Sequence, residues 1–220
     1  MNDAVIIEPS TNHQASIIWL HGLGSDGHDF EPIVPELKLP EELGIRFIFP
    51  HAPLRPVTIN GGMVMRSWYD IKDADLSVQR HRPDFDDSAE ILESWINAEI
   101  ASGIPTNKIV VAGFSQGGAI ALHCGLRFPL KLAGLLILSS YLPFADILDQ
   151  EQSEINRDTS ILMMHGEYDP VIPIEFARQS CEALKAYQYP IEWHDYPMEH
   201  AVCAEEIKRT GEWLFTRLGS

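Results

Sequence analysis

Apolar residues gather along the chain in short continuous runs, each about as long as one β-strand. The runs occupy residues 15–20, 45–49, 109–112, 135–138, 161–164 and 191–193, with a shorter one at 5–7. Because most of these runs show no alternation of polar and apolar residues, they predict strands covered on both faces, as in a parallel sheet. The short run at 5–7 is expected to form an edge strand.

Between these runs the hydrophobic positions follow the period of an α-helix. Leu92, Ile96 and Ile100 form one such stripe, in a helix that Pro83 opens and Gly103 ends. Further helices are expected at 29–39, directly after Ser115, at 174–187, and in a C-terminal segment striped by Cys203, Ile207, Leu214 and Leu218. Strands alternating with helices, without an internal repeat or a shift in composition, predict one α/β domain over residues 1–220.

Two segments lie outside this alternation. Residues 53–70 are punctuated by proline and glycine but carry methionine, tryptophan and tyrosine, so they predict a long, irregular, apolar loop. Loops of that length in a compact domain are often functional. Residues 146–158 are polar and are expected to lie on the surface.

Charge and cysteine content narrow the possible partners and compartment. The 220 residues include 16 basic and 32 acidic ones, a net charge of −16 that would repel nucleic acid or an anionic membrane surface. The three cysteines, Cys124, Cys181 and Cys203, form no CxxC pair, so a reducing compartment is expected. No basic segment followed by an apolar core opens the chain, and the apolar run at 132–138 is too short to span a bilayer. A cytoplasmic protein without membrane insertion is expected.

Ser115 stands at the centre of the pattern Gly113-Phe114-Ser115-Gln116-Gly117. The same letters would suit an ordinary tight turn, but here they join a buried strand to a helix. That placement is typical of a nucleophile elbow, in which a sharp turn exposes the serine hydroxyl. The sequence therefore predicts Ser115 as a nucleophile.

A serine hydroxyl needs a base, and the base needs an orienting carboxylate. Asp169 follows the strand at 161–164 and His200 follows the last strand, so both reach the edge of the sheet where Ser115 lies. The chain order Ser, Asp, His is that of an α/β-hydrolase. Other aspartates and histidines compete for these two roles, and the alternative interpretation of each is a structural or surface role. They are Asp146, Asp149, Asp158, Asp195, His21, His51, His123, His165 and His194.

An acyl-transfer site also needs donors for the oxyanion of its tetrahedral intermediate. The backbone N–H of Gln116, directly after the nucleophile, is one expected donor. The loop His21-Gly22-Leu23-Gly24 follows an early strand, and the N–H of Leu23 is the second expected donor.

Two other classes of function fit parts of the chain. Gly22-Leu23-Gly24-Ser25-Asp26-Gly27 also matches GxGxxG, which would suit a dinucleotide-binding module. That reading needs an acidic residue closing the next strand, and Phe49-Pro50-His51-Ala52 supplies none. A hydrolase fold without activity, serving as a binding partner, is a further alternative. No metal-binding spacing is present, so neither a metal nor a cofactor is expected.

Taken together, the motifs HGLG at 21–24, PVTIN at 56–60, WYD at 68–70, GFSQGG at 113–118 and HG-x-x-D at 165–169 resemble one family. The chain is similar to bacterial members of the carboxylesterase/acyl-protein thioesterase (lysophospholipase-like) family of small α/β-hydrolases. The resemblance runs from about residue 17 to the C-terminus.

This resemblance implies a three-layer α/β-hydrolase sandwich with a mostly parallel sheet and no large cap domain. It implies cleavage of small-molecule carboxylic esters or thioesters of short to medium acyl chain, with acylated proteins as a further substrate. It also implies that residues 53–68 and 141–143 border the acyl pocket. Met65, Trp68 and Leu142 are therefore candidate substrate-binding residues. The alternative is that the methionine and tryptophan of this apolar loop only pack in the core. A homodimer is compatible with the family.

Overall fold

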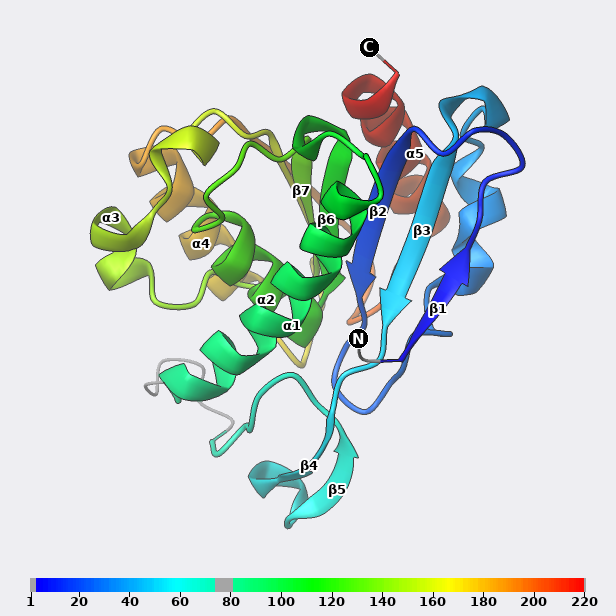
Figure 1. Cartoon of the computed structure of the whole chain (residues 1–220). Helices are drawn as coiled ribbons and strands as arrows, with labels where there is room; N and C mark the ends of the chain where they lie inside the picture. Colours follow the sequence, from blue (N-terminus) through cyan, green and yellow to red (C-terminus); the bar gives the residue numbers. More distant parts are fainter. Residues whose placement is uncertain (1–2, 74–80, 220) are drawn as a thin grey trace.

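A seven-stranded sheet forms the centre of the computed structural model, which describes residues 3–73 and 81–219. The strand order is β1-β3-β2-β6-β7-β8-β9, and every neighbouring pair is parallel except β1 with β3. The strands are β1 (Ala4–Ile7), β2 (Ala15–Leu20), β3 (Ile45–Pro50), β6 (Ile109–Phe114), β7 (Gly134–Leu138), β8 (Ile161–Gly166) and β9 (Ile191–Tyr196). The predicted mostly parallel α/β sheet is confirmed, with the short edge strand at the expected place (Figure 1).

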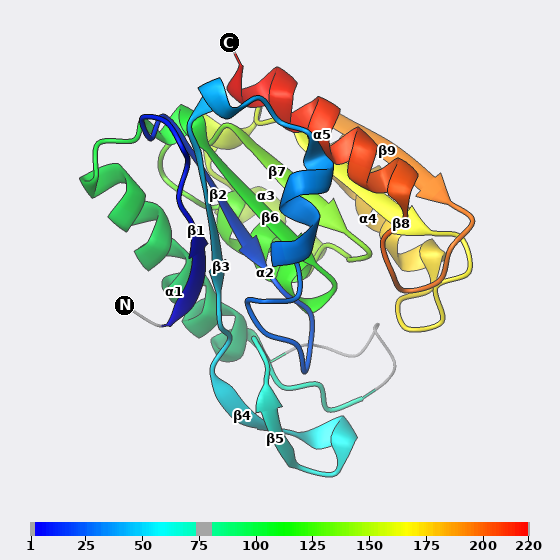
Figure 2. The ribbon, with the colours of Figure 1, turned by 90° about the vertical axis from the view of Figure 1, so that its right-hand side faces the viewer.

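Helices cover both faces of this sheet, as Figures 1 and 2 show. The helices are α1 (Arg82–Ala101), α2 (Gln116–Gly125), α3 (Leu148–Glu151), α4 (Ile174–Ala186) and α5 (Ala204–Leu218). Ile18 of β2 packs into a core with α1, α2 and α4, whereas its neighbour Ile17 packs on the other face with α5 and a 3-10 helix at Glu31–Leu37. Side chains alternate across a strand, so one continuous apolar run supplies two cores. The result is the expected three-layer sandwich.

The segment 53–70 is more regular than its composition predicts. Strands β4 (Leu54–Val57) and β5 (Met63–Arg66) pair antiparallel in a small separate sheet, joined by a 3-10 turn at Thr58–Asn60. Figure 1 shows this hairpin projecting beyond the carboxyl ends of β2 and β3. Within the described ranges, no large cap domain is inserted between the core elements.

Three further expectations need correction. The helix expected at 29–39 is a 3-10 helix at Glu31–Leu37, because the ring of Pro35 would clash with the carbonyl of Glu31, four residues earlier, in an α-helix. Cys203 is the N-cap residue of α5 rather than part of its core stripe, and it is half-buried. In the polar segment 146–158, Leu148 and Asn156 are completely buried, and Asn156 hydrogen-bonds the backbone at 128–132.

The domain expected over 1–220 includes residues 1–2, 74–80 and 220, which lie outside the described ranges. Across residues 3–73 and 81–219, no helix is both long and apolar enough to cross a bilayer.

Candidate active site

The strand–helix corner at Ser115 has the backbone that the sequence pattern requires. Ser115 has φ 54° and ψ −120°, a conformation that non-glycine residues rarely adopt, and it caps α2 directly after β6. A Cβ on Gly113 would overlap the backbone of Gly117, and one on Gly117 would overlap the carbonyl of Leu20. Both glycines are therefore needed for the chain to fold back so tightly. The Ser140 hydroxyl donates to the Ser115 carbonyl over 2.7 Å and secures the corner.

Three residues far apart in the sequence form one hydrogen-bonded relay. His200 Nε2 lies 2.9 Å from Ser115 Oγ, and His200 Nδ1 lies 2.6 Å from Asp169 Oδ2. Since a carboxylate can only accept, Nδ1 carries the proton and Nε2 is free to accept from the serine hydroxyl. Ser115 is 8% exposed and Asp169 6%, while His200 is half-buried. The structure thus brings together the serine, carboxylate and histidine that the sequence selected.

The loops that carry Asp169 and His200 are bonded to each other. The N–H of Tyr168 donates to the carbonyl of Met198 over 3.0 Å. A Cβ on Gly166, at the end of β8, would overlap the backbone at 198–199. Because β8 and β9 are neighbouring parallel strands, both loops leave the same edge of the sheet and pack closely.

Asp169 accepts hydrogen bonds at both carboxylate oxygens. Its Oδ1 accepts from the backbone N–H groups of Val171 and Ile172, each over 2.8 Å, and its Oδ2 accepts from His200. Burial alone would raise the pKa of Asp169, but donation from His165, from His200 and from the Ile172 N–H outweighs burial and holds this pKa far below the ordinary value. Asp169 is therefore a carboxylate at every pH at which a histidine can act as a base.

His165 is a neighbour of Asp169 whose contribution the sequence analysis did not identify. Its Nε2 donates to the Ile172 carbonyl over 2.8 Å and lies 3.3 Å from Asp169 Oδ2. The expected role in hydrogen bonding within a loop is confirmed, but the contact with the carboxylate is additional. The spacing His165-x-x-x-Asp169 was the available signal.

The loop after β2 lies against Ser115. A Cβ built on Gly22 would stand 3.5 Å from Ser115 Cβ, and the Gly24 N–H donates to the Arg66 carbonyl over 2.8 Å. In the described part of the chain, the backbone N–H groups of Leu23 and Gln116 donate to no protein acceptor. Two unused backbone donors therefore flank Ser115.

The side chain of Gln116 also has a structural role. Its Oε1 accepts from the Trp68 N–H and its Nε2 donates to the Tyr69 carbonyl, each over 2.7 Å. The residue after the nucleophile thus fixes the chain that returns from the β4–β5 hairpin. Sequence reasoning assigned only the backbone N–H of Gln116.

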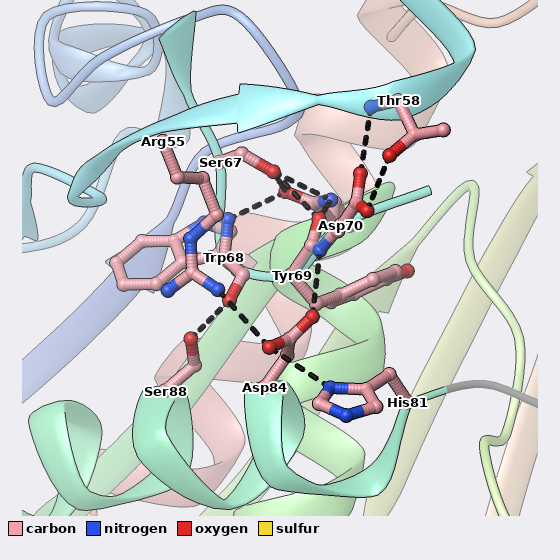
Figure 3. Close-up of polar contacts among 10 residues, drawn as sticks. Arg55, Thr58, Ser67, Trp68, Tyr69, Asp70, His81, Asp84 and Ser88 are labelled. Carbon is pink, nitrogen blue, oxygen red and sulfur yellow. Dashed lines mark hydrogen bonds and ion pairs between the residues drawn. The ribbon is translucent and has the colours of Figure 1, made fainter. Parts of the chain in front are cut away.

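The same returning chain is anchored to α1 and to the hairpin (Figure 3). Ser88 donates to the Trp68 carbonyl, and Asp84 Oδ2 accepts from the Asp70 N–H over 3.1 Å. The Asp70 carboxylate in turn accepts from the N–H and the hydroxyl of Thr58, over 2.7 and 2.6 Å. The hairpin, the returning chain and α1 therefore form one hydrogen-bonded unit beside Ser115.

The three candidate substrate-binding residues differ in their exposure to solvent. Met65 is half-buried, and its Sδ lies 3.7 Å from a Cβ built on Gly24. Leu142 is 6% exposed. Trp68 is completely buried, and its indole N–H donates to the His21 carbonyl over 2.9 Å. In this structure Trp68 offers no surface for direct substrate contact, because it packs beneath the loop at 21–24.

Most competing residues have partners elsewhere in the fold. Asp158 pairs with Lys131, and Asp195 pairs with Arg178. The remaining histidines bond to the following atoms: His51 to the Gly27 N–H, His123 to Asp86 and His194 to Glu192. Asp146 and Asp149 are exposed. The relay at Ser115 uses none of them.

The dinucleotide alternative lacks its structural context. No α-helix begins at Gly22–Gly27, since the chain passes through turns to the 3-10 helix at Glu31–Leu37. Strand β3 ends at Pro50 without a carboxylate, and the Gly27 N–H is already bonded to His51. The loop therefore does not form the phosphate-binding turn that this reading requires.

A hydroxyl next to an oriented imidazole, with two free backbone donors beside it, can attack a carbonyl carbon and hold the resulting oxyanion. Together with the sheet topology, this arrangement defines a serine hydrolase of the α/β-hydrolase class. The family model described as Phospholipase/Carboxylesterase matches residues 1–217, and the chain belongs to that family.

Relatives in sequence and structure agree with this class. Acyl-protein thioesterase 1 of Neurospora crassa is 39% identical, over 97% of this chain and 91% of that protein. The protein of the same name from Yarrowia lipolytica is 36% identical, over 96% and 95%. The crystal structure of Arabidopsis thaliana SOBER1 has a TM-score of 0.87 at 32% identity, over 93% of this chain and 99% of that one. That of Zea mays acyl-protein thioesterase 2 has a TM-score of 0.86 at 29% identity, over the whole of both chains.

The chain is accordingly an enzyme that hydrolyses ester or thioester bonds, as the sequence predicted. The relatives named here are fungal and plant proteins, and the bacterial affiliation stays a prediction.

Proposed function

We propose that this protein is an acyl-protein thioesterase, which hydrolyses the thioester between a protein cysteine and a short to medium acyl chain. The observation that carries the proposal is the unbroken relay from Ser115 Oγ through His200 to Asp169. The full-length likeness to proteins named acyl-protein thioesterase 1, at 36–39% identity, supports this substrate class.

In the first half of the proposed reaction, Ser115 Oγ forms a bond to the carbonyl carbon while its proton passes to His200 Nε2. The carbonyl π electrons move to the oxygen, and the N–H groups of Leu23 and Gln116 stabilise this oxyanion. When the tetrahedral intermediate collapses, the carbon–sulfur bond breaks and the leaving thiol takes the proton from His200. An acyl-enzyme on Ser115 remains.

In the second half, water replaces the thiol. His200 takes one proton from the water, whose oxygen attacks the acyl carbon, and the same two N–H groups again stabilise the oxyanion. Collapse breaks the bond to Ser115 Oγ, which regains a proton from His200, and the free carboxylic acid leaves. Asp169 stays ionised throughout, orients the ring and stabilises the imidazolium.

We propose that Met65 and Leu142 border the acyl chain, although Leu142 is only 6% exposed in this structure. Met65 is half-buried beside the loop at 21–24, so it has surface to offer and an adaptable side chain. Trp68 would act from beneath, by supporting that loop, rather than by touching the substrate.

The proposal is tested with purified wild-type protein and the variant Ser115→Ala. Paired series of p-nitrophenyl esters and S-acylated peptides, matched in acyl length, give kcat/KM for oxygen and sulfur leaving groups. We expect Ser115→Ala to abolish both activities with an unchanged circular dichroism spectrum, and a fluorophosphonate probe to label only the wild type. Full activity in the variant would reject Ser115 as the nucleophile. Hydrolysis of the esters alone would make the protein a carboxylesterase without thioesterase activity.

The expected assembly and compartment belong to the same proposal. A cytoplasmic enzyme that acts on acylated proteins, as a homodimer, fits the resemblance to the family. Light scattering after size exclusion measures the mass directly and would reject the dimer if it gave a single chain of 24.7 kDa.

A further inference from the structure

His21 follows β2 and is completely buried, with an exposed fraction of 1%. Its Nε2 lies 3.0 Å from the backbone nitrogen of Ala52, and its Nδ1 lies 2.7 Å from the carbonyl oxygen of Gly22. The Ala52 N–H can only donate and the Gly22 carbonyl can only accept. The ring is therefore neutral, with its proton on Nδ1, and donates to Gly22.

The Gly22 carbonyl belongs to the same peptide unit as the Leu23 N–H. No peptide bond in the described ranges is cis, so the carbonyl and the N–H of this planar unit point in opposite directions. Any bond that fixes the direction of the carbonyl also fixes the direction of the N–H.

We propose that His21 is a positioning residue for catalysis, and that its Nδ1–H holds the Gly22–Leu23 peptide with the Leu23 N–H turned toward the reacting carbonyl. This inference rests on the proposed function, in which Leu23 supplies half of the oxyanion hole. Donation to the Gly22 carbonyl also polarises the peptide and strengthens the Leu23 N–H as a donor.

The ring can hold the peptide because His21 is itself held in place, both at its ring and at its backbone carbonyl. Ala52 donates to Nε2, and the indole of Trp68 lies against the imidazole with ring centroids 5.3 Å apart. The indole N–H also donates to the His21 carbonyl over 2.9 Å, which fixes the preceding peptide. Arg66 donates to the Ala52 carbonyl over 2.9 Å, so the segment that holds the ring is tied to β5.

Among the residues that the structure describes, no comparable donor could replace the imidazole. The other hydrogen bond to the Gly22 carbonyl comes from the Ser25 N–H at 3.3 Å, longer than the 2.7 Å bond from His21. Gly22 has no side chain to restrict its rotation. Without the ring, only the longer bond from Ser25 would keep the peptide from turning the Leu23 N–H away from the oxyanion.

Burial keeps the ring in this state at neutral pH. Desolvation lowers the pKa of His21, and the bond to Gly22 and the carboxylates of Asp26 and Asp29 oppose it without reversing the shift. A protonated ring would set two donors, Nε2–H and the Ala52 N–H, against each other.

The test compares His21→Asn with His21→Leu, two side chains of similar shape. Both remove the acceptor for the Ala52 N–H, so that part of the damage is common to the pair. Only asparagine can place an N–H where Nδ1 donates to Gly22. His21→Gln serves as a third variant, with an acceptor in reach of Ala52 and no donor at the Nδ1 position. Urea unfolding and circular dichroism report on the fold of each.

We expect kcat for His21→Asn to exceed that of His21→Leu at least tenfold, as removing an oxyanion donor costs about 10²–10³ in kcat. KM should stay similar across the pair. A trifluoromethyl ketone analogue, which forms an oxyanion on Ser115, should lose affinity in His21→Leu in proportion to kcat/KM. A thioether analogue without a carbonyl should bind both variants equally.

Equal kcat in the two variants, or unchanged affinity of His21→Leu for the trifluoromethyl ketone, would overturn the inference. If His21→Leu does not fold, the same comparison between His21→Asn and His21→Gln decides, because these two also differ in the donor at the Nδ1 position. Failure of the proposed function looks different: the wild type would then hydrolyse S-acylated peptides no faster than Ser115→Ala.

Discussion

Replacing Asp169 with asparagine changes one oxygen to an NH₂ group and should stop the relay without emptying any space. The two backbone N–H groups of Val171 and Ile172, each 2.8 Å from Oδ1, require an acceptor there. The carboxamide oxygen must therefore take the Oδ1 position, which leaves the NH₂ group at the Oδ2 position, 2.6 Å from His200 Nδ1.

An NH₂ group in that place can only donate, so His200 Nδ1 must become an acceptor and the ring proton must move to Nε2. Nε2 is the atom that faces Ser115 Oγ at 2.9 Å, and once protonated it cannot take the serine proton. In a serine triad the wrong tautomer lowers kcat by about 10⁴. At about 1.36 kcal/mol for each factor of ten, this corresponds to about 5 kcal/mol in activation free energy.

The assay is kcat on a p-nitrophenyl ester at neutral pH, for wild type, Asp169→Asn and Asp195→Asn. Asp195 is a matched control: it also lies near the end of a late strand, but pairs with Arg178 on the surface. We expect a loss of about 10⁴ for the first variant and less than about twofold for the control. A loss smaller than tenfold in Asp169→Asn, in a folded protein, would refute the assignment of the ring tautomer.

Three further outcomes concern the fold around the site. Gly117→Ala should lower the free energy of unfolding by about 3 kcal/mol or more, because the new Cβ overlaps the Leu20 carbonyl. The control Gly61→Ala, where φ is 67° but the space is open, should lower it by about 1 kcal/mol. Urea unfolding measures both. Ser115→Gly should abolish hydrolysis and raise the free energy of unfolding by about 1 kcal/mol, because glycine adopts a positive φ without strain. A lower free energy of unfolding would contradict this prediction. Burial raises the pKa of Glu206 to about 8, and a hydrogen bond with the Cys203 backbone opposes this without reversing it. Ionisation of Glu206 therefore destabilises the fold as pH rises from the unfolded pKa of about 4.3 to about 8. Glu206→Gln should gain stability over the wild type across this window, and a difference independent of pH would refute it.

Much of this site could be predicted from local chemistry. Ser115 could be predicted because a nucleophile elbow needs glycine at fixed positions on both sides, and both glycines lie within the same five adjacent residues. Asp169 and His200 were recognisable because parallel strands β8 and β9 end at one edge of the sheet, so residues just after them must meet. These inferences depend only on strand order and chain direction.

The helix expected at 29–39 and the exposed segment at 146–158 could not be predicted as well. The ring of Pro35 clashes with the carbonyl four residues earlier in an α-helix, and hydrophobic periodicity alone does not distinguish an α-helix from a 3-10 helix. The polar sequence around Asn156 predicts a surface position for it. The residue is buried instead, because its amide makes hydrogen bonds to the backbone at 128–132. Burial of a polar side chain depends on partners that lie elsewhere in the chain.

The sequence by itself determined the fold class and predicted the candidate nucleophile and the order of its partners, since these follow from patterns within a few residues and from the rules of parallel sheets. Only the tertiary structure decided how the site is held: the ring of His21 on the Gly22 carbonyl, His165 beside Asp169, and the amide of Gln116 on the chain at 68–69. The reason is physical. A hydrogen bond of this kind depends on the mutual orientation of two groups, and that orientation exists only once separate segments have packed together.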